Sequence, residues 1–256
     1  MQPACAVDAV AAGAAGADCK LLQHRLQCFL YLWGLFFIAP LKGGTSYSST
    51  DKKSCSGNIS PSEYIALEGL YNATDGTNWI WRRVGNVSSH WHFPSNLSAP
   101  CEEHWQGIIC KDAKACQAQN TEIPCCISEI VLPRYNLYGR IPSSLAFMSS
   151  LEVLWLGENL LHGTIPPELG NLTAMESLIL SVANLNGPIP MELGNLRQLS
   201  ELSLEANHLT GTVPTSLGRL SNLTGLALYI NFLSGPIPSE LGLLRNPPIC
   251  YVVGII

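Results

Sequence analysis

A 24-residue period runs through residues 127–246 and constrains the fold more than any other feature of the sequence. The five copies begin at Ile127, Leu151, Met175, Leu199 and Leu223. In each copy, apolar residues occupy unit positions 1, 4 and 6, and Leu occupies position 11. The alternation at positions 4 and 6 predicts a short strand with one buried face. A single unit buries too little apolar surface to fold alone, so the copies are expected to stack around a shared core.

The second half of each copy carries Gly at position 13 and Pro at position 16, from Gly139 and Pro142 to Gly235 and Pro238. Glycine at a fixed place favours a turn with positive φ or a close approach of another segment. Proline fixes its own φ and lacks a donor, so the return path is expected to be irregular. Each unit is therefore predicted to be a strand, a turn and a return path, with the strands paired in a parallel sheet.

The segment 199–220, LSELSLEANHLTGTVPTSLGRL, resembles the plant-type leucine-rich repeat of pattern LxxLxLxxNxLxGxIPxxLGxL. It departs from that pattern only at Val213, where the pattern has Ile. The resemblance implies an α/β-type solenoid, a right-handed superhelix with a parallel β-sheet on its concave side and irregular or 3-10 structure on its convex side. The family includes receptor-like proteins, receptor-kinase ectodomains and polygalacturonase inhibitors.

The family's Asn at position 9 is present here as Asn159, Asn207 and Asn231. The resemblance implies that its side-chain amide binds backbone groups in the bend, because an amide has both donors and acceptors. Tyr135 and Ala183 stand at this position in the other two copies, so those two coils are expected to be less regular.

Residues 58–126 are predicted to form an N-terminal cap. The run Ser60-Pro61-Ser62-Glu63 matches a capping box with Pro at the first helical position, which predicts a helix ending near Asn72. The segments LYNATDGTNW and CEEHWQGIIC resemble the cap that precedes plant-type repeats. The resemblance implies a disulfide between Cys101 and Cys110 and a Trp105 side chain over the end of the core.

The two ends of the chain are expected to differ from the repeats. Residues 1–45 are predicted to be a signal peptide or an uncleaved signal-anchor, because the apolar run 28–41 is shorter than the roughly 20 residues of a membrane span. As an anchor, the run would tether the protein to a membrane. Residues 46–57 are a predicted linker. Residues 247–256 are a predicted uncapped tail, explained by truncation, by one added strand or by a partner that covers the end.

Cysteine usage and glycosylation motifs indicate a secreted or cell-surface protein. Seven of the ten cysteines follow the apolar run, which is typical of an oxidising compartment. Six N-x-[ST] motifs predict glycosylation at Asn58, Asn72, Asn86, Asn96, Asn171 and Asn222. None falls on positions 2–8 of a repeat, so the concave face is expected to stay free of sugar.

The outward positions of the strands form the candidate ligand-binding face. Side chains at positions 5, 7 and 8 are predicted to contact ligand, namely Val131, Arg134, Trp155, Glu158, Ile179, Val182, Glu205 and Tyr229. Val131, Trp155 and Ile179 share position 5 and should form an apolar ridge. The carboxylates beside them, at Glu129, Glu152, Glu176 and Glu201, are interpreted as a solvated face.

Other classes of function lack support in the sequence. The net charge of −5 argues against nucleic acid, and no phosphate-binding loop, nucleophile elbow or kinase motif occurs. The spacing of His90, His92, Cys101, His104 and Cys110 matches no structural zinc site, so no metal, cofactor or catalytic residue is predicted.

The sequence thus predicts an extracellular, non-enzymatic module that recognises a protein, peptide or glycan, with a co-receptor as a further candidate partner. The alternatives are a structural protein of the wall, matrix or cell surface, and a truncated ectodomain of a receptor-like kinase.

Overall fold

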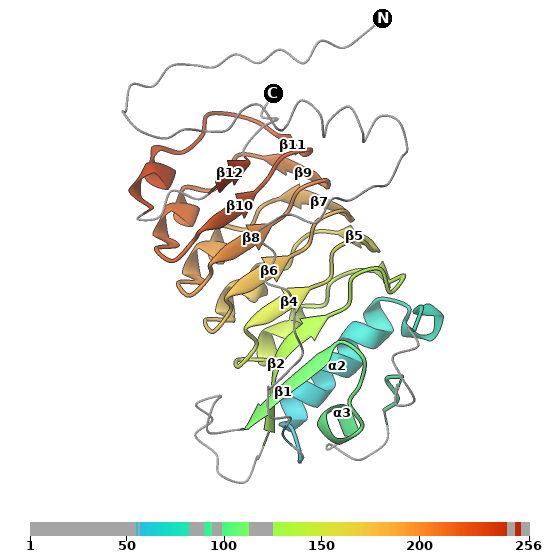
Figure 1. Cartoon of the computed structure of the whole chain (residues 1–256). Helices are drawn as coiled ribbons and strands as arrows, with labels where there is room; N and C mark the ends of the chain where they lie inside the picture. The colour runs from blue at the N-terminus through green and yellow to red at the C-terminus, as the bar shows by residue number, and fades with distance from the viewer. Residues whose placement is uncertain are drawn as a thin grey trace, which may run out of the picture. The chain divides into compact units, whose positions relative to one another are not determined.

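A computed structural model describes residues 55, 57–81, 90–93, 99–112, 125–244 and 249–251 (Figure 1). All of them belong to one compact unit, Thr50–Ile256. The predicted signal segment and its apolar run, residues 28–41, lie outside the described residues.

The cap begins with helix α2 (Pro61–Ala73), whose start follows the predicted capping box. The Ser60 side chain accepts the Glu63 N–H at 3.2 Å, and the Glu63 carboxylate accepts the Ser60 N–H at 3.0 Å. The short elements η1 (Gly76–Asn78), α3 (Ala99–Glu102) and β1 (Ile108–Asp112) follow. Trp105 is 1% exposed and packs against Trp91 and Phe93, so the core of the cap is largely aromatic.

A seven-stranded sheet runs through the repeats in the order β1-β2-β4-β6-β8-β10-β12. Its strands after β1 are β2 (Cys125–Val131), β4 (Val153–Trp155), β6 (Ser177–Ile179), β8 (Glu201–Ser203), β10 (Gly225–Ala227) and β12 (Ile249–Tyr251). Strands β2 to β12 are parallel and pair residues one repeat apart, such as Leu154 with Leu178. The predicted parallel sheet of stacked coils is therefore confirmed, and Figure 1 shows the strands stepping along it.

Both ends of this sheet differ from what the repeats alone predict. Strand β1 of the cap pairs antiparallel with β2, so the cap extends the sheet by one strand of opposite direction. At the other end, β12 pairs parallel with β10, so the tail adds one strand, as one of the three sequence-based alternatives proposed. Leu244, which precedes this strand, is only 7% exposed.

A second sheet, absent from the sequence-based prediction, covers another side of the coils. Its order is β11-β9-β7-β5-β3, with strands β3 (Tyr138–Gly139), β5 (Leu160–Gly163), β7 (Asn184–Pro188), β9 (His208–Gly211) and β11 (Phe232–Leu233). In each coil the Leu at position 11 is buried and its neighbours at positions 10 and 12 are exposed or partly exposed, which is the alternation of a strand with one buried face. The Gly that follows has positive φ, for example +82° at Gly163, so the chain turns there.

The return path of each coil contains a 3-10 helix, as the resemblance implied. These helices are η2 (Ser143–Phe147), η3 (Pro167–Asn171), η4 (Met191–Asn195), η5 (Thr215–Arg219) and η6 (Ser239–Leu243). Each follows the Pro at position 16, whose extended backbone starts the turn. The Leu at the third position of each helix is buried.

The position-9 asparagines bind the backbone as expected. The Asn207 amide donates to the carbonyls of Leu180 and Leu204 at 2.9 and 3.1 Å, and its oxygen accepts the Leu185 N–H at 3.1 Å. Of the two coils predicted to be less regular, the coil with Tyr135 carries an additional left-handed residue, Asn136 with a φ of +63°, but the prediction is wrong for the coil with Ala183. Val182 before it has the same left-handed backbone as position 8 of the other coils, because neighbouring coils impose the bend.

Candidate functional site

The apolar ridge, defined as Val131, Trp155 and Ile179, lies on the outward face of the seven-stranded sheet. Val131 pairs with Trp155 across β2 and β4, and Trp155 pairs with Ile179 across β4 and β6. All three are partly exposed. The residue that precedes each of them on its own strand, such as Leu154 before Trp155, is buried. The sheet therefore brings these three predicted residues together, and ligand contact stays a prediction.

Trp155 carries an unsatisfied donor at the centre of the ridge. Its indole Nε1 is buried and has no hydrogen-bond partner within the part of the chain that the structure describes. A buried donor without a partner costs about 1–3 kcal/mol. Trp91 of the cap avoids this cost, since its Nε1 donates to the Gln106 carbonyl at 2.9 Å. The sequence identified Trp155 as exposed on the sheet, but it carried no signal for this orphan N–H.

The predicted residues at position 8 lie beyond the strands rather than on them. Strand β4 ends at Trp155, and Glu158 follows in a bend with a φ of +57°. Arg134 and Glu158 form an ion pair with each other, so their charges are matched within the protein. Val182 is 38% exposed at the same place in the third coil. These side chains form a rim beside the sheet face.

Position 7 contributes one partly buried acid, Glu205, and one aromatic ring, Tyr229, to the same edge. The Glu205 carboxylate accepts a hydrogen bond from the Ser203 hydroxyl. Burial raises the pKa of Glu205, while hydrogen bonds from Ser203 and Ser181 act in the opposite direction. Tyr229 is partly exposed in the last full coil.

The acidic residues were interpreted as a solvated face, and this is wrong for Glu129, which is buried. Its side chain is 1% exposed on β2. Burial and, in smaller measure, the nearby charges of Glu152 and Glu176 together raise the pKa of Glu129 to about 7. Glu152 forms an ion pair with Lys111 of β1, whereas Glu176 is exposed. Strand β1 of the cap lies beside β2 and accounts for the difference between the prediction and the structure. The sequence-based prediction placed no neighbouring strand on that side of β2.

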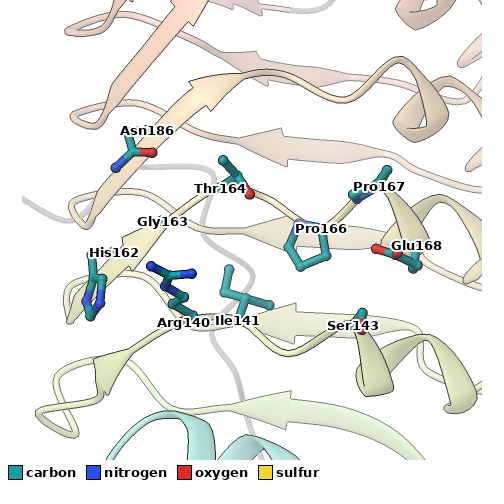
Figure 2. Close-up of a pocket in the computed structure, with 10 residues that line it drawn as sticks. All are labelled: Arg140, Ile141, Ser143, His162, Gly163, Thr164, Pro166, Pro167, Glu168 and Asn186. Atoms are coloured by element: carbon teal, nitrogen blue, oxygen red, sulfur yellow. The ribbon is translucent and has the colours of Figure 1, made fainter.

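A cavity of about 470 Å³ lies on another side of the molecule, between the first and second coils (Figure 2). Figure 2 shows Arg140 and His162 at one end and Glu168 at the other, with Ile141 and Pro166 between them. Gly163, Thr164, Ser143, Pro167 and Asn186 complete its lining. None of these residues was a sequence-based candidate, because their convergence depends on the pairing of β5 with its neighbours.

Comparison with known proteins agrees with this architecture. The sequence model of the Leucine Rich Repeat family matches residues 150–172 and 198–220. A chain in the crystal structure of the BIR3–SERK2 complex from Arabidopsis thaliana is 33% identical, with a TM-score of 0.56, and the match covers 72% of this chain and 90% of that one. This chain belongs to the plant-type leucine-rich repeat family.

Two further solved ectodomain structures are similar to this leucine-rich repeat chain. The BIR2 ectodomain from Arabidopsis thaliana is 29% identical, with a TM-score of 0.54, over 70% of this chain and 85% of that one. The ectodomain of the receptor kinase GASSHO1/SCHENGEN3 from the same plant, in complex with CASPARIAN STRIP INTEGRITY FACTOR 2, is 28% identical. Its TM-score is 0.52, and the match covers 72% of this chain but 23% of that one. No curated protein matches the chain.

The cysteines and sequons of this leucine-rich repeat protein are placed as follows. The implied Cys101–Cys110 disulfide is confirmed, and a second bond joins Cys55 to Cys125. The sequon residues Asn58, Asn72, Asn171 and Asn222 are exposed and lie off the seven-stranded sheet, while Asn86 and Asn96 lie outside the described residues. Glycosylation at these sites stays a prediction.

The described residues hold neither a cluster of metal ligands nor a membrane-spanning helix. No group of three or more His, Cys, Asp or Glu side chains in this part of the chain is arranged to hold a metal ion. None of its helices has the length and apolar character needed to cross a membrane.

Proposed function

We propose that this leucine-rich repeat protein is an extracellular, non-enzymatic recognition module that binds a protein, peptide or glycan on its concave sheet face. The observation that carries the proposal is the orphan Nε1–H of Trp155 at the centre of the apolar ridge. This donor is closed to solvent, so a ligand would reach it only if the Trp155 indole rotates outward as the ligand covers the ridge, which gives the N–H an acceptor in the same step.

The chemistry of the ridge favours a peptide segment among these ligands. A peptide backbone supplies carbonyl acceptors at regular intervals, and its side chains supply apolar contacts for Val131 and Ile179. The rim pair Arg134–Glu158 is charge-matched and lies beyond the end of the strand. It would therefore contribute orientation more than affinity.

The related structures support binding to peptides and proteins. The GASSHO1/SCHENGEN3 ectodomain was solved with CASPARIAN STRIP INTEGRITY FACTOR 2, and BIR3 was solved with SERK2. By analogy, a co-receptor is a second expected class of partner for this chain. The fold alone does not assign a ligand, so the proposal depends on the ridge.

An extracellular location agrees with the chemistry of the cap. Its two described disulfides join Cys55 to Cys125 and Cys101 to Cys110. Such bonds persist in oxidising compartments and are rare in the cytosol. The four described sequon residues are exposed, which would allow glycosylation without covering the ridge.

The test uses ligands selected from a random peptide library and from a glycan array against the whole chain. Binding of each selected ligand is then measured with Trp155→Ala, Ile179→Ala and Trp155→Phe, which keeps an aromatic ring but removes the N–H. Tyr138→Ala is the matched control, because Tyr138 is an exposed aromatic on the second sheet.

Truncation of Trp155 is expected to weaken binding at least tenfold, as for an aromatic residue at the centre of an interface. Trp155→Phe should lose roughly three- to tenfold, the contribution of one hydrogen bond. The control should bind as the wild type does. Equal binding by Trp155→Ala, Ile179→Ala and the wild type, with unchanged circular dichroism, would reject the ridge as the ligand site.

A further inference from the structure

The cavity between the first and second coils combines one cationic side chain with several neutral hydrogen-bonding groups. Arg140 enters it from the end of β3, and His162 belongs to β5. Thr164 and Asn186 lie nearby in Figure 2, while Glu168 stands at the opposite end on η3. Its lining comes from three consecutive coils, so the cavity exists only when those coils are stacked.

Arg140 is held in position through its backbone. Its N–H donates to the Ala73 carbonyl of the cap at 3.1 Å. Its side chain forms no ion pair or hydrogen bond with any residue that the structure describes, and Glu168 lies beyond ion-pair distance from it. A guanidinium group with five donors therefore remains available at one end of the cavity.

Gly163 makes room for this side chain. A Cβ built at Gly163 would stand 3.3 Å from Arg140 Cγ and 3.5 Å from Arg140 Nε. The φ of +82° at this glycine also disfavours any residue with a side chain. The Arg140 stem thus lies against bare backbone, and its charged group is directed along the cavity wall.

The rest of the lining matches a hydroxylated ligand better than an apolar one. Ser143, Thr164 and Asn186 offer hydroxyl and amide groups, while Glu168 supplies an acceptor. Ile141 and Pro166 are buried beneath them and provide a small apolar floor. A volume of about 470 Å³ is within the range of small-ligand sites and suits one or two sugar rings.

We propose that this cavity binds an anionic sugar, a mono- or disaccharide unit that carries a carboxylate, sulfate or phosphate group. Arg140 pairs with the charged group, for which its planar fork has the matching geometry. His162, Thr164 and Asn186 bind ring hydroxyls, and the apolar face of the ring lies on Pro166. This site is separate from the concave ridge and does not depend on what the ridge binds.

The experiment is isothermal titration calorimetry of the whole chain with three probes: glucuronate, glucose 6-phosphate and uncharged glucose. The variants are Arg140→Gln and Asn186→Ala. Arg197→Gln is the control, since Arg197 is an exposed arginine outside the cavity. The first two probes separate a carboxylate from a phosphate as the preferred anion.

At least one charged probe is expected to bind saturably, and glucose at least tenfold more weakly. Arg140→Gln should weaken the charged probe by roughly tenfold or more, the effect of a hydrogen-bonded charge pair, while Arg197→Gln should have no effect. Asn186→Ala should weaken charged probe and glucose by similar factors, because it removes a contact to a hydroxyl. Absence of saturable binding by both charged probes, or equal affinity of Arg140→Gln and the wild type, would overturn the proposal.

Discussion

The carboxylate of Glu63 accepts a hydrogen bond from the backbone N–H of Ile127 at 3.0 Å. Glu63 belongs to the first turn of α2, and Ile127 lies in β2, the first strand of the repeat region. The other oxygen of the same carboxylate accepts the Ser60 N–H in the capping box at 3.0 Å. One buried side chain therefore starts the cap helix and joins it to the repeats.

Replacement of this carboxylate should destabilise the whole unit. Glu63→Ala is expected to lower the free energy of unfolding by about 3 kcal/mol, because two backbone donors lose their acceptor. The matched control is Glu68→Ala on the exposed side of the same helix, which should change stability by less than about 0.5 kcal/mol. Chemical denaturation followed by circular dichroism measures both, and equal effects of the two variants would contradict the role of Glu63.

Loss of a position-9 amide should be more damaging than loss of an exposed one. Asn207→Ala leaves the Leu185 N–H and the carbonyls of Leu180 and Leu204 without their partner, so we expect a loss of about 3–5 kcal/mol. Asn207→Asp keeps the acceptor but removes the donors, and should be nearly as harmful. Asn184→Ala, at an exposed position, should be close to neutral. A neutral Asn207→Ala variant in urea unfolding would refute the inferred network.

Val182 offers a site at which substitution should stabilise the protein. Its φ of +53° is unfavourable for a β-branched side chain, at a cost of about 1–2 kcal/mol, whereas Asn tolerates this conformation. We therefore expect Val182→Asn to raise the melting temperature by the equivalent of about 1 kcal/mol. The same change at Val153, in the extended strand β4, should lower it. A lower melting temperature for Val182→Asn would argue against strain at this bend.

Glu129 should make stability depend on pH. Its pKa is about 7 in the folded protein, whereas the ordinary value of 4.5 applies in the unfolded chain. Between pH 4.5 and 7 the folded state therefore binds more protons than the unfolded chain. The free energy of unfolding contributed by this group is then greatest below pH 4.5 and falls as the pH rises towards 7. Glu129→Gln should remove the effect, so its stability relative to the wild type should rise between pH 4.5 and 7 by up to about 3 kcal/mol.

Thermal melts of Glu129→Gln and the wild type over a pH series measure this difference. The exposed carboxylate Glu176 provides the control through Glu176→Gln, which should leave the pH dependence of the wild type largely intact. A constant difference between Glu129→Gln and the wild type at all pH values would show that the acid does not titrate as described.

The two disulfides should contribute unequally to stability. Cys55 and Cys125 are separated by 70 residues, whereas Cys101 and Cys110 are separated by 9. In the chain-entropy view, removal of the first bond costs about 4 kcal/mol and removal of the second about 2.5 kcal/mol. Paired Cys→Ala variants, compared by denaturant unfolding under oxidising conditions, measure the difference. A larger loss from the Cys101–Cys110 pair would contradict this order.

The repeat pattern was enough to predict the coils themselves. The apolar positions of Leu154 and Leu178 specify which face of each strand is buried, and the period of 24 places Val131, Trp155 and Ile179 in one row. These predictions follow from local spacing, because identical units must stack in register to bury their leucines.

Other features depend on contacts between residues that do not occupy equivalent positions in different repeats. The burial of Glu129 depends on β1, which pairs antiparallel with β2 and is not a repeat strand. The second sheet arises from positions 10 to 13, where the alternation is short and the paired residues of neighbouring coils differ by two unit positions, as in the pairing of Tyr138 at position 12 with Leu160 at position 10.

The sequence by itself determined the repeat unit, its inward leucines, the capping box at Ser60 and the row of outward residues, since each follows from spacing along the chain. Only the tertiary structure decided which polar groups are isolated from water and which are left without a partner. The orphan N–H of Trp155, the raised pKa of Glu129 and the unpaired guanidinium of Arg140 all depend on neighbours brought in by the packing of distant segments, because burial and charge pairing are properties of the surroundings of a side chain.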